Sequence, residues 1–271
     1  MIRRLIGVVA ALGSVACTEV VTDPNAVVAL RFDGSAYPSI VARDSLRDSL
    51  GALQPLLATA LNYRGERVED AVFAFSSPDT VLRVFDDGVV YATVRKPDGT
   101  PARVFATVGT LQSQPDSLVV VQRADSIAGK TSEIVPVAAT ADFTISQPDS
   151  LRFFVYGDTA TTGPPATVPA WLVSFQLRYK GTLIAPNDTS VAFMFVPTNT
   201  TPPDRRLMPI DTTDAQGKAT RQLVVKSIPT TVTEDTIFVI ATIRTRRSGD
   251  APITAQTMVL LRRGTTPMIQ P

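Results

Sequence analysis

The chain has 271 residues, a net charge of +1, no His and a single Cys. Without His, neither a Ser-His-Asp nor a Cys-His mechanism is possible, and nearly every metal site built on nitrogen or sulfur ligands is excluded as well. The near-neutral charge gives no basic surface for nucleic acid, and one Cys allows no disulfide within the chain. We therefore expect a protein that is not an enzyme, needs no cofactor or metal, and depends on packing alone for its stability.

The first residues predict an exported protein. Arg3 and Arg4 precede an apolar run at 5–12 and a run of mostly small residues at 13–16. This is the anatomy of a secretory signal peptide, and the apolar run is too short to span a bilayer comfortably. We expect residues 1–16 to be this signal peptide.

The only Cys follows this segment directly. Ser14, Val15, Ala16 and Cys17 resemble the bacterial lipobox, in which the Cys is lipidated and becomes the first residue of the mature chain. The resemblance implies a lipid anchor at Cys17, and Thr18, where Asp is associated with inner-membrane retention, implies sorting to the outer membrane. Ser14 stands where the lipobox usually has Leu, which leaves ordinary signal-peptide cleavage after Ala16 as the alternative.

Past residue 25, apolar and polar residues alternate with a period of two, which is typical of half-buried strands. The clearest case is 173–179, where Val173, Phe175 and Leu177 share one face and Ser174 and Gln176 share the other. Turns rich in Asp, Gly and Pro separate the strands and leave little room for long helices. Similar runs occur at 27–32, 57–63, 71–75, 89–94, 102–108, 118–121, 190–196, 219–225, 237–243 and 257–261.

One segment, 39–57, fits this pattern less clearly. Leu46 and Leu50 lie four positions apart, and each follows an Asp-Ser pair. This spacing fits a short helix or a bridging loop.

The two halves of the chain share an ordered series of short matches. Their constant order and drifting offsets are what a duplicated strand plan with loop insertions would produce. Roughly seven strands in about 100 residues is the pattern of an immunoglobulin-like sandwich. The matches are 30–32 with 151–153, 61–65 with 177–181, 73–75 with 193–195, Gly88 with Gly217, 104–108 with 239–243, and 119–121 with 259–261.

Two short motifs resemble bacterial immunoglobulin-like domains. The segment 214–220, DAQGKAT, is similar to the Asp-x-x-Gly-x-Ala signature of the invasin and intimin type, and 75–79 with 87–90 looks like the second bacterial family. The resemblance implies an all-β protein with two tandem immunoglobulin-like β-sandwich domains. We expect a tether at 17–24, a first domain at 25–123, a linker at 124–139, a second domain at 140–264 and a tail at 265–271.

Three groups of side chains could form sites. Trp171 and Tyr156 could make a spot for stacking sugars. The acidic turn residues are interpreted as partners of the turn backbone, with calcium binding as the alternative. Strand-end arginines are interpreted as solvated charge, with contact to anionic lipid as the alternative. The acidic residues are Asp86, Asp87, Asp211, Asp214, Glu234 and Asp235, and the basic ones are Arg244, Arg246, Arg247, Arg262 and Arg263.

The leading functional hypothesis is a non-enzymatic, lipid-anchored envelope protein whose domains act as spacer, adhesion or protein-interaction modules. It would contact the membrane through its N-terminal lipid, on the periplasmic face or the cell surface. A glycan-binding module and a periplasmic accessory subunit of an envelope assembly are the alternatives. Two carboxylates would suffice for glycoside hydrolysis, but no segment outside the strands is large enough to build a substrate cleft.

Overall fold

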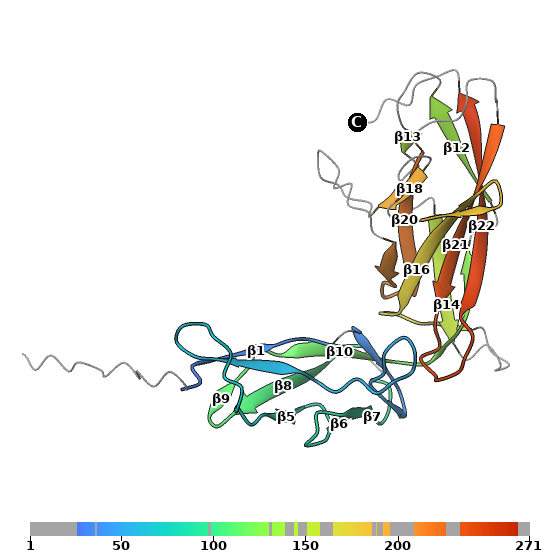
Figure 1. The fold of residues 1–271 in the computed structure, drawn as a ribbon. Coiled ribbons are helices and arrows are strands. Elements are labelled where there is room, and N and C mark those ends of the chain that lie inside the picture. Colours follow the sequence, from blue (N-terminus) through green and yellow to red (C-terminus); the bar gives the residue numbers. More distant parts are fainter. Residues whose placement is uncertain are drawn as a thin grey trace, which may run out of the picture.

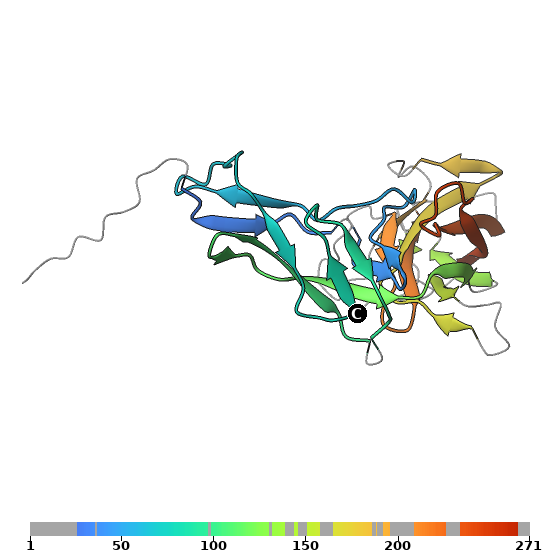
Figure 2. The same cartoon turned by 90° about the horizontal axis from the view of Figure 1, so that it is seen from below.

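The computed structural model describes a bent molecule of two β-sandwiches (Figure 1). Seen from below, the first sandwich extends away from the second, which is viewed roughly along its strands (Figure 2). The described part contains no α-helix, and therefore no helix long and apolar enough to cross a membrane. The predicted signal peptide, Cys17, the tether and the C-terminal tail lie outside it. The described residues are 26–35, 37–96, 99–129, 132–138, 144–145, 151–157, 165–185, 188, 192–195, 209–225 and 234–264.

The first sandwich packs two sheets around a small aliphatic core. One sheet has the order β2-β10-β8-β5 with β9 beside β8, the other has the order β3-β7-β6, and β1 pairs separately with β4. Ile40, Val104 and Leu118 are fully buried between the layers. The strands are β1 (Ala29–Phe32), β2 (Ser39–Val41), β3 (Asp44–Ser45), β4 (Ala58–Leu61), β5 (Ala74–Ser76), β6 (Leu82–Val84), β7 (Val90–Ala92), β8 (Ala102–Val108), β9 (Leu111–Gln112) and β10 (Asp116–Val121).

The second sandwich is larger and has longer strands. One sheet runs β11-β14-β20-β13 with β15 and β18 at its sides, and the other runs β12-β22-β21-β16-β17 with β19 beside β16. The rings of Phe153 and Phe175 meet edge-to-face across the core at 5.6 Å. The strands are β11 (Ala124–Gly129), β12 (Ser132–Ala138), β13 (Thr144–Ile145), β14 (Leu151–Gly157), β15 (Ala166–Thr167), β16 (Leu172–Tyr179), β17 (Thr182–Ile184), β18 (Ala192–Phe195), β19 (Ile210–Thr212), β20 (Lys218–Val225), β21 (Glu234–Ile243) and β22 (Ile253–Gly264).

Both units have the strand order of an immunoglobulin-like sandwich. In each, an early strand runs parallel to the last strand, which also pairs antiparallel with a preceding strand: the order is β2-β10-β8 in the first and β12-β22-β21 in the second. The predicted fold class, all-β with two tandem immunoglobulin-like sandwiches, is confirmed in the described residues.

Only some of the sequence matches between the two halves join strands that hold equivalent places in the two sandwiches. The last two join β8 to β21 and β10 to β22, which hold equivalent places, and Gly88 and Gly217 both have positive φ before equivalent strands. The first three do not: β14 pairs with β20, β16 with β21 and β18 with β20, whereas β1 pairs with β4 and β5 with β8. Short apolar strands resemble one another, so sequence similarity alone did not fix their partners.

The predicted linker, 124–139, is instead the start of the second sandwich. β11 pairs antiparallel with β14, and β12 pairs parallel with β22 over seven residues. The first sandwich therefore passes into the second with only residues 122–123 between β10 and β11.

The strand phase predicted for β16 is confirmed. Val173, Phe175 and Leu177 are at most 4% exposed, while Ser174 and Gln176 face outward.

The ambiguous segment is not a helix. It contains β2 and β3 and a bridged turn, and Leu46 is buried while Leu50 is 63% exposed, so the two do not share a face.

Candidate functional site: the domain junction and the adjoining groove

A buried arginine joins the two sandwiches. Arg246, in the turn after β21, is 3% exposed and donates from Nη1 to the Ser39 carbonyl at 2.7 Å and from Nη2 to Ser39 Oγ at 3.1 Å. Its guanidinium also lies over two rings, 4.1 Å from the centroid of Trp171 and 4.6 Å from that of Tyr37. Ser39 and Tyr37 belong to the first sandwich and Trp171 to the second. We call these four residues the junction clamp.

The clamp holds a cation in the interior without a carboxylate partner among the described residues. Burial lowers the pKa of Arg246 to about 10, with Tyr37 opposing and Arg123 adding to the shift. The group therefore stays charged at neutral pH. The faces of two aromatic rings and the two hydrogen bonds accepted by Ser39 replace the water that the guanidinium loses on burial. Cation–π contacts are strongest where the cation is desolvated in this way.

Local hydrogen bonds hold the other members of the clamp in place. Trp171 N donates to Thr213 Oγ1 at 2.8 Å, and Thr213 N donates back to the Trp171 carbonyl at 2.9 Å. Tyr37 Oη accepts a 2.7 Å bond from Ser49 N. Ala170, next to the tryptophan, has φ of 52°, and Arg246 has φ of 60°. Non-glycine residues with positive φ carry backbone strain, which surrounding contacts must offset.

Further polar contacts cross the junction. Ser39 Oγ donates to the Ala170 carbonyl at 2.5 Å. Arg123 forms an ion pair with Asp44 of the first sandwich and donates to the Thr245 carbonyl of the second at 2.8 Å. Burial alone would raise the pKa of Asp44, but hydrogen bonds from Arg47 and Arg123 outweigh it and lower that pKa below its ordinary value.

The apolar core also runs through the junction. Val41 of β2 and Val121 of β10, both in the first sandwich, pack into the same cluster as Trp171 and Phe153 of the second. The two sandwiches therefore share buried surface instead of meeting only through a loop.

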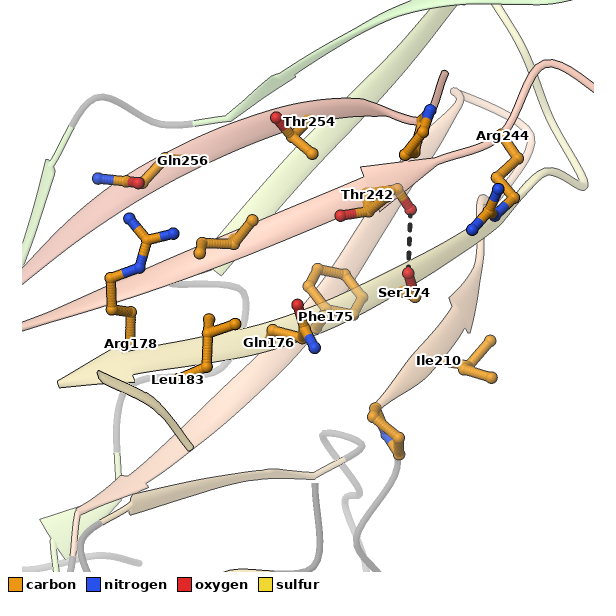
Figure 3. A pocket seen from close by; sticks show the side chains of 13 residues that line it. Ser174, Phe175, Gln176, Arg178, Leu183, Ile210, Thr242, Arg244, Thr254 and Gln256 are labelled. Carbon is orange, nitrogen blue, oxygen red and sulfur yellow. Dashed lines mark hydrogen bonds between the residues drawn. The ribbon is translucent and has the colours of Figure 1, made fainter. Parts of the chain in front are cut away.

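A groove lies beside the clamp on the outer face of the second sandwich (Figure 3). It has a volume of about 630 Å³ and crosses β16, β21 and β22, with Arg178 at one end and Arg244 at the other. Gln176 and Thr242 lie between them, and the flanking Ile210 is 54% exposed. We call this feature the sheet groove.

The sheet groove adjoins a smaller hollow at the junction. This hollow, of about 190 Å³, is lined by Tyr37, Trp171 and Arg246 of the clamp. It shares Ser174, Ile210, Thr242 and Arg244 with the sheet groove. The hollow and the groove thus form one continuous depression, and clamp residues line the part of it at the junction.

The two predicted sugar-stacking residues do not lie together. Trp171 is 1% exposed and carries the Arg246 guanidinium over its ring, so it is an interior residue of the junction. Tyr156 is half-buried on β14, in the opposite sheet, where its ring stacks on Phe154 at 6.4 Å. The geometry gives Trp171 a structural role and corrects the prediction of a joint platform.

Acidic side chains in the turns accept hydrogen bonds from backbone N–H groups of the same turns. Asp214 Oδ1 accepts bonds from the backbone N–H groups of Gln216 and Lys218, and Asp87 Oδ1 accepts one from Val89. Within the described ranges, no group of three or more carboxylates lies close enough to hold a metal ion.

The strand-end arginines do not gather at one corner of the second sandwich. β21 and β22 are antiparallel, with Ile243 opposite Ile253 and Glu234 opposite Arg262. Arg244 therefore lies at the opposite end of the strand pair from Arg262, which forms an ion pair with Glu234 at 2.7 Å. Arg246, expected to be solvated, is buried instead.

Sequence reasoning missed the roles of Ser39, Tyr37 and Arg246. Cation–π pairs of Trp with Arg are common, but Trp171 stands 75 positions before Arg246, so its presence did not indicate which arginine it contacts. The 207 positions between Ser39 and Arg246 left no local pattern that could join them.

Comparison with known proteins gives only distant likenesses. No protein-family model matches the chain, and no curated protein matches its sequence. Among solved structures, the Yersinia pseudotuberculosis adhesin InvE is 12% identical with a TM-score of 0.33, over 86% of this chain and 58% of that one. Mouse cadherin-23 EC22-24 is 12% identical with a TM-score of 0.25, over 88% and 65%. Human mucin-like protocadherin EC1-2 is 8% identical with a TM-score of 0.29, over 87% and 98%.

The chain thus spans less than two thirds of the length of the adhesin and of the cadherin-23 fragment. Likenesses at this level carry no argument about function. The fold assignment rests on the strand pairing described above.

Proposed function

We propose that this chain is an exported, lipid-anchored envelope protein without enzymatic activity, in which two immunoglobulin-like domains form one rigid arm that presents an interaction surface. The anchor would be the lipid on Cys17, at the outer membrane. The arm would hold the sheet groove at a distance from the bilayer.

The junction clamp is the observation that carries the proposal. Domains in one chain usually move relative to each other unless their interface is large and apolar. Here a buried cation, a shared apolar core and the Arg123–Asp44 ion pair all cross the junction. A fixed bend suits a protein that must present a surface in one orientation, and it has no use in a flexible string of spacers.

The glycan-binding alternative has less support. Sugars stack on exposed ring faces, and the ring of Trp171 is buried under Arg246. The chain is therefore proposed as a protein-interaction module.

Two measurements test the proposal. The first is incorporation of labelled palmitate in bacteria, which should occur in the wild type and in Thr18→Ser and disappear in Cys17→Ser. Equal labelling of all three would overturn the lipid anchor.

The second is the distance between two spin labels, placed by Val72→Cys and Met258→Cys in the Cys17→Ser chain. Both positions are exposed, one in each sandwich, at 84% and 39%. We expect one narrow distance distribution. A broad distribution would overturn the rigid arm while leaving the anchor untouched.

A further inference from the structure

We propose that the sheet groove binds an extended acidic peptide of a partner protein, with one carboxylate at Arg178 and a second at Arg244. This inference deepens the interaction role proposed above and rests on it for its biological setting. Its chemistry rests on the groove alone.

The shape of the groove fits an extended chain. Its volume of about 630 Å³ follows the outer face of β16, β21 and β22 (Figure 3). Gln176, Thr242 and Gln256 line its floor with groups that can bond a peptide backbone, while Leu183 and Ile210 flank it with exposed apolar side chains. Alternating polar and apolar contacts are what the two faces of an extended peptide need.

The charge of the groove is positive and uncompensated. None of the described residues that line it is Asp or Glu. Within the part of the chain that the structure describes, the guanidinium groups of Arg178 and Arg244 have no hydrogen bond and no ion pair. A guanidinium binds a carboxylate with two parallel hydrogen bonds. A partner that places carboxylates at these two arginines should therefore bind more tightly than one with neutral groups there.

The adjoining hollow adds a third cation. Among the described residues, Arg246 donates hydrogen bonds only to neutral Ser39 and lies against two rings, and it lines the hollow that shares Arg244 with the groove. Positive charge therefore continues from the groove into the junction. An approaching acidic segment would be attracted along this whole line.

The register sets the spacing of the two carboxylates. Thr242 pairs with Ser174, and Arg244 follows Thr242 by two positions, so it stands about six residues along the sheet from Arg178. At the rise of a strand this separation is about 20 Å. An extended peptide spans it with acidic residues six positions apart.

A peptide fits better than an acidic glycan. Among the described residues that line the groove, the one aromatic side chain is Phe175, which points into the core and is 2% exposed. The groove thus offers no ring face to a sugar. Leu183 and Ile210 instead offer contacts to aliphatic side chains.

The test is fluorescence anisotropy with the purified full-length chain and a labelled synthetic peptide. The peptide has two aspartates six positions apart, with valine and threonine alternating between them, and the control peptide has asparagine at both places. We expect the aspartate peptide to bind at least about tenfold more tightly than the control, and less tightly as salt is raised. Arg178→Gln and Arg244→Gln should each weaken it by about tenfold, because each removes one charge-assisted pair. Arg247→Gln, which is exposed but outside the groove, should have no effect.

Three outcomes would overturn the proposal. The first is equal binding of the aspartate and asparagine peptides. The second is displacement of the peptide by an acidic oligosaccharide that itself binds more tightly, which would assign the groove to a glycan. The third is a dimer in sedimentation that dissociates in Arg244→Gln, which would assign the groove to a second copy of this chain. None of these outcomes alters palmitate labelling or the distance between the spin labels, so the inference and the proposed function fail separately.

Discussion

Arg246 and Ser39 lie 207 positions apart in the chain and in different sandwiches, yet the arginine donates two hydrogen bonds to this one serine. Burying a cation costs free energy unless its donors are satisfied. The serine carbonyl and hydroxyl take up two of the donors, and two aromatic rings lie against the guanidinium. The clamp therefore stabilises one particular arrangement of the domains, because in any other arrangement the buried guanidinium would lose its hydrogen-bond acceptors and ring contacts.

Arg246→Ala should loosen the junction more than it unfolds either sandwich. It removes two charge-assisted hydrogen bonds and two cation–π contacts, together worth about 2 kcal/mol after the cost of burying the charge is relieved. The spin-label distance distribution should broaden, and the melting temperature should fall. Arg247→Ala, one position on and exposed, should change neither.

Arg246→Lys separates charge from shape. Lysine keeps the positive charge but cannot bond Ser39 with two donors of a planar group or stack on Trp171 in the same way. We expect it to behave nearly like Arg246→Ala. A narrow distance distribution in Arg246→Lys would show that charge alone holds the junction and would contradict the clamp.

Gly51→Ala tests the close approach of the two sandwiches. A Cβ at Gly51 would lie 2.4 Å from Ser248 N, in the turn that carries Arg246. Gly65→Ala is the matched control, because Gly65 also has positive φ, 77° against 88°, but nothing lies within 4 Å of its Cβ position. Both variants pay the backbone strain of about 1–2 kcal/mol.

Only Gly51→Ala should in addition broaden the spin-label distances and lower the free energy of unfolding further. If denaturant titration gave equal losses in the free energy of unfolding for the two variants, the junction would accommodate the added Cβ without further cost.

Period-two alternation predicted the fold class and many strands correctly, because burial on one face of a sheet is recorded locally. For β16 it gave the correct phase, and for β8 it gave the observed bounds, Ala102–Val108. It missed β11 and β12, because a register irregularity between Ala124 and Ser126 interrupts the period of two in β11 and Pro136 interrupts β12.

The site was out of reach for the same reason. From the sequence, Arg246 is expected to be an exposed surface charge. It is buried only through tertiary contacts with Ser39, Tyr37 and Trp171. Trp171 was interpreted as a sugar-stacking residue, whereas its ring lies inside the junction against the guanidinium of Arg246. The placement of Arg178 and Arg244 at opposite ends of one groove depends on the register of β16 and β21, which the sequence does not specify.

Phe175→Ala should lower the free energy of unfolding by about 3–5 kcal/mol, the usual cost of truncating a buried aromatic residue. The ring is 2% exposed and packs against Phe153 and under Arg221. Phe175→Asp should cost more, because it adds an unpaired charge to the core. Gln176→Asp, on the outer face of the same strand, should have little effect in a thermal melt. A melt of Phe175→Asp that matched the wild type would mean that β16 has the opposite phase.

The junction should also loosen in acid through Asp44. Its pKa is held below the ordinary 3.8 by hydrogen bonds from Arg47 and Arg123, which outweigh the opposing effect of burial. A carboxyl with a lowered pKa stabilises the fold fully above its unfolded pKa, and this contribution is lost as pH falls through its folded pKa. The loss therefore begins below about pH 4 and is complete only at lower pH.

In this range the ion pair between Asp44 and Arg123 is neutralised, and the spin-label distances should broaden relative to those at neutral pH. Asp44→Asn should show the broader distribution at neutral pH already and little further change on acidification. Asp79→Asn is the matched control, since hydrogen bonds from Arg103 and Lys96 also lower the pKa of Asp79, but all three lie within the first sandwich. It should alter the acid unfolding of that sandwich and leave the interdomain distance unchanged. If the distances stayed narrow in acid for the wild type, Arg246 and the shared apolar core would hold the junction without any contribution from Asp44.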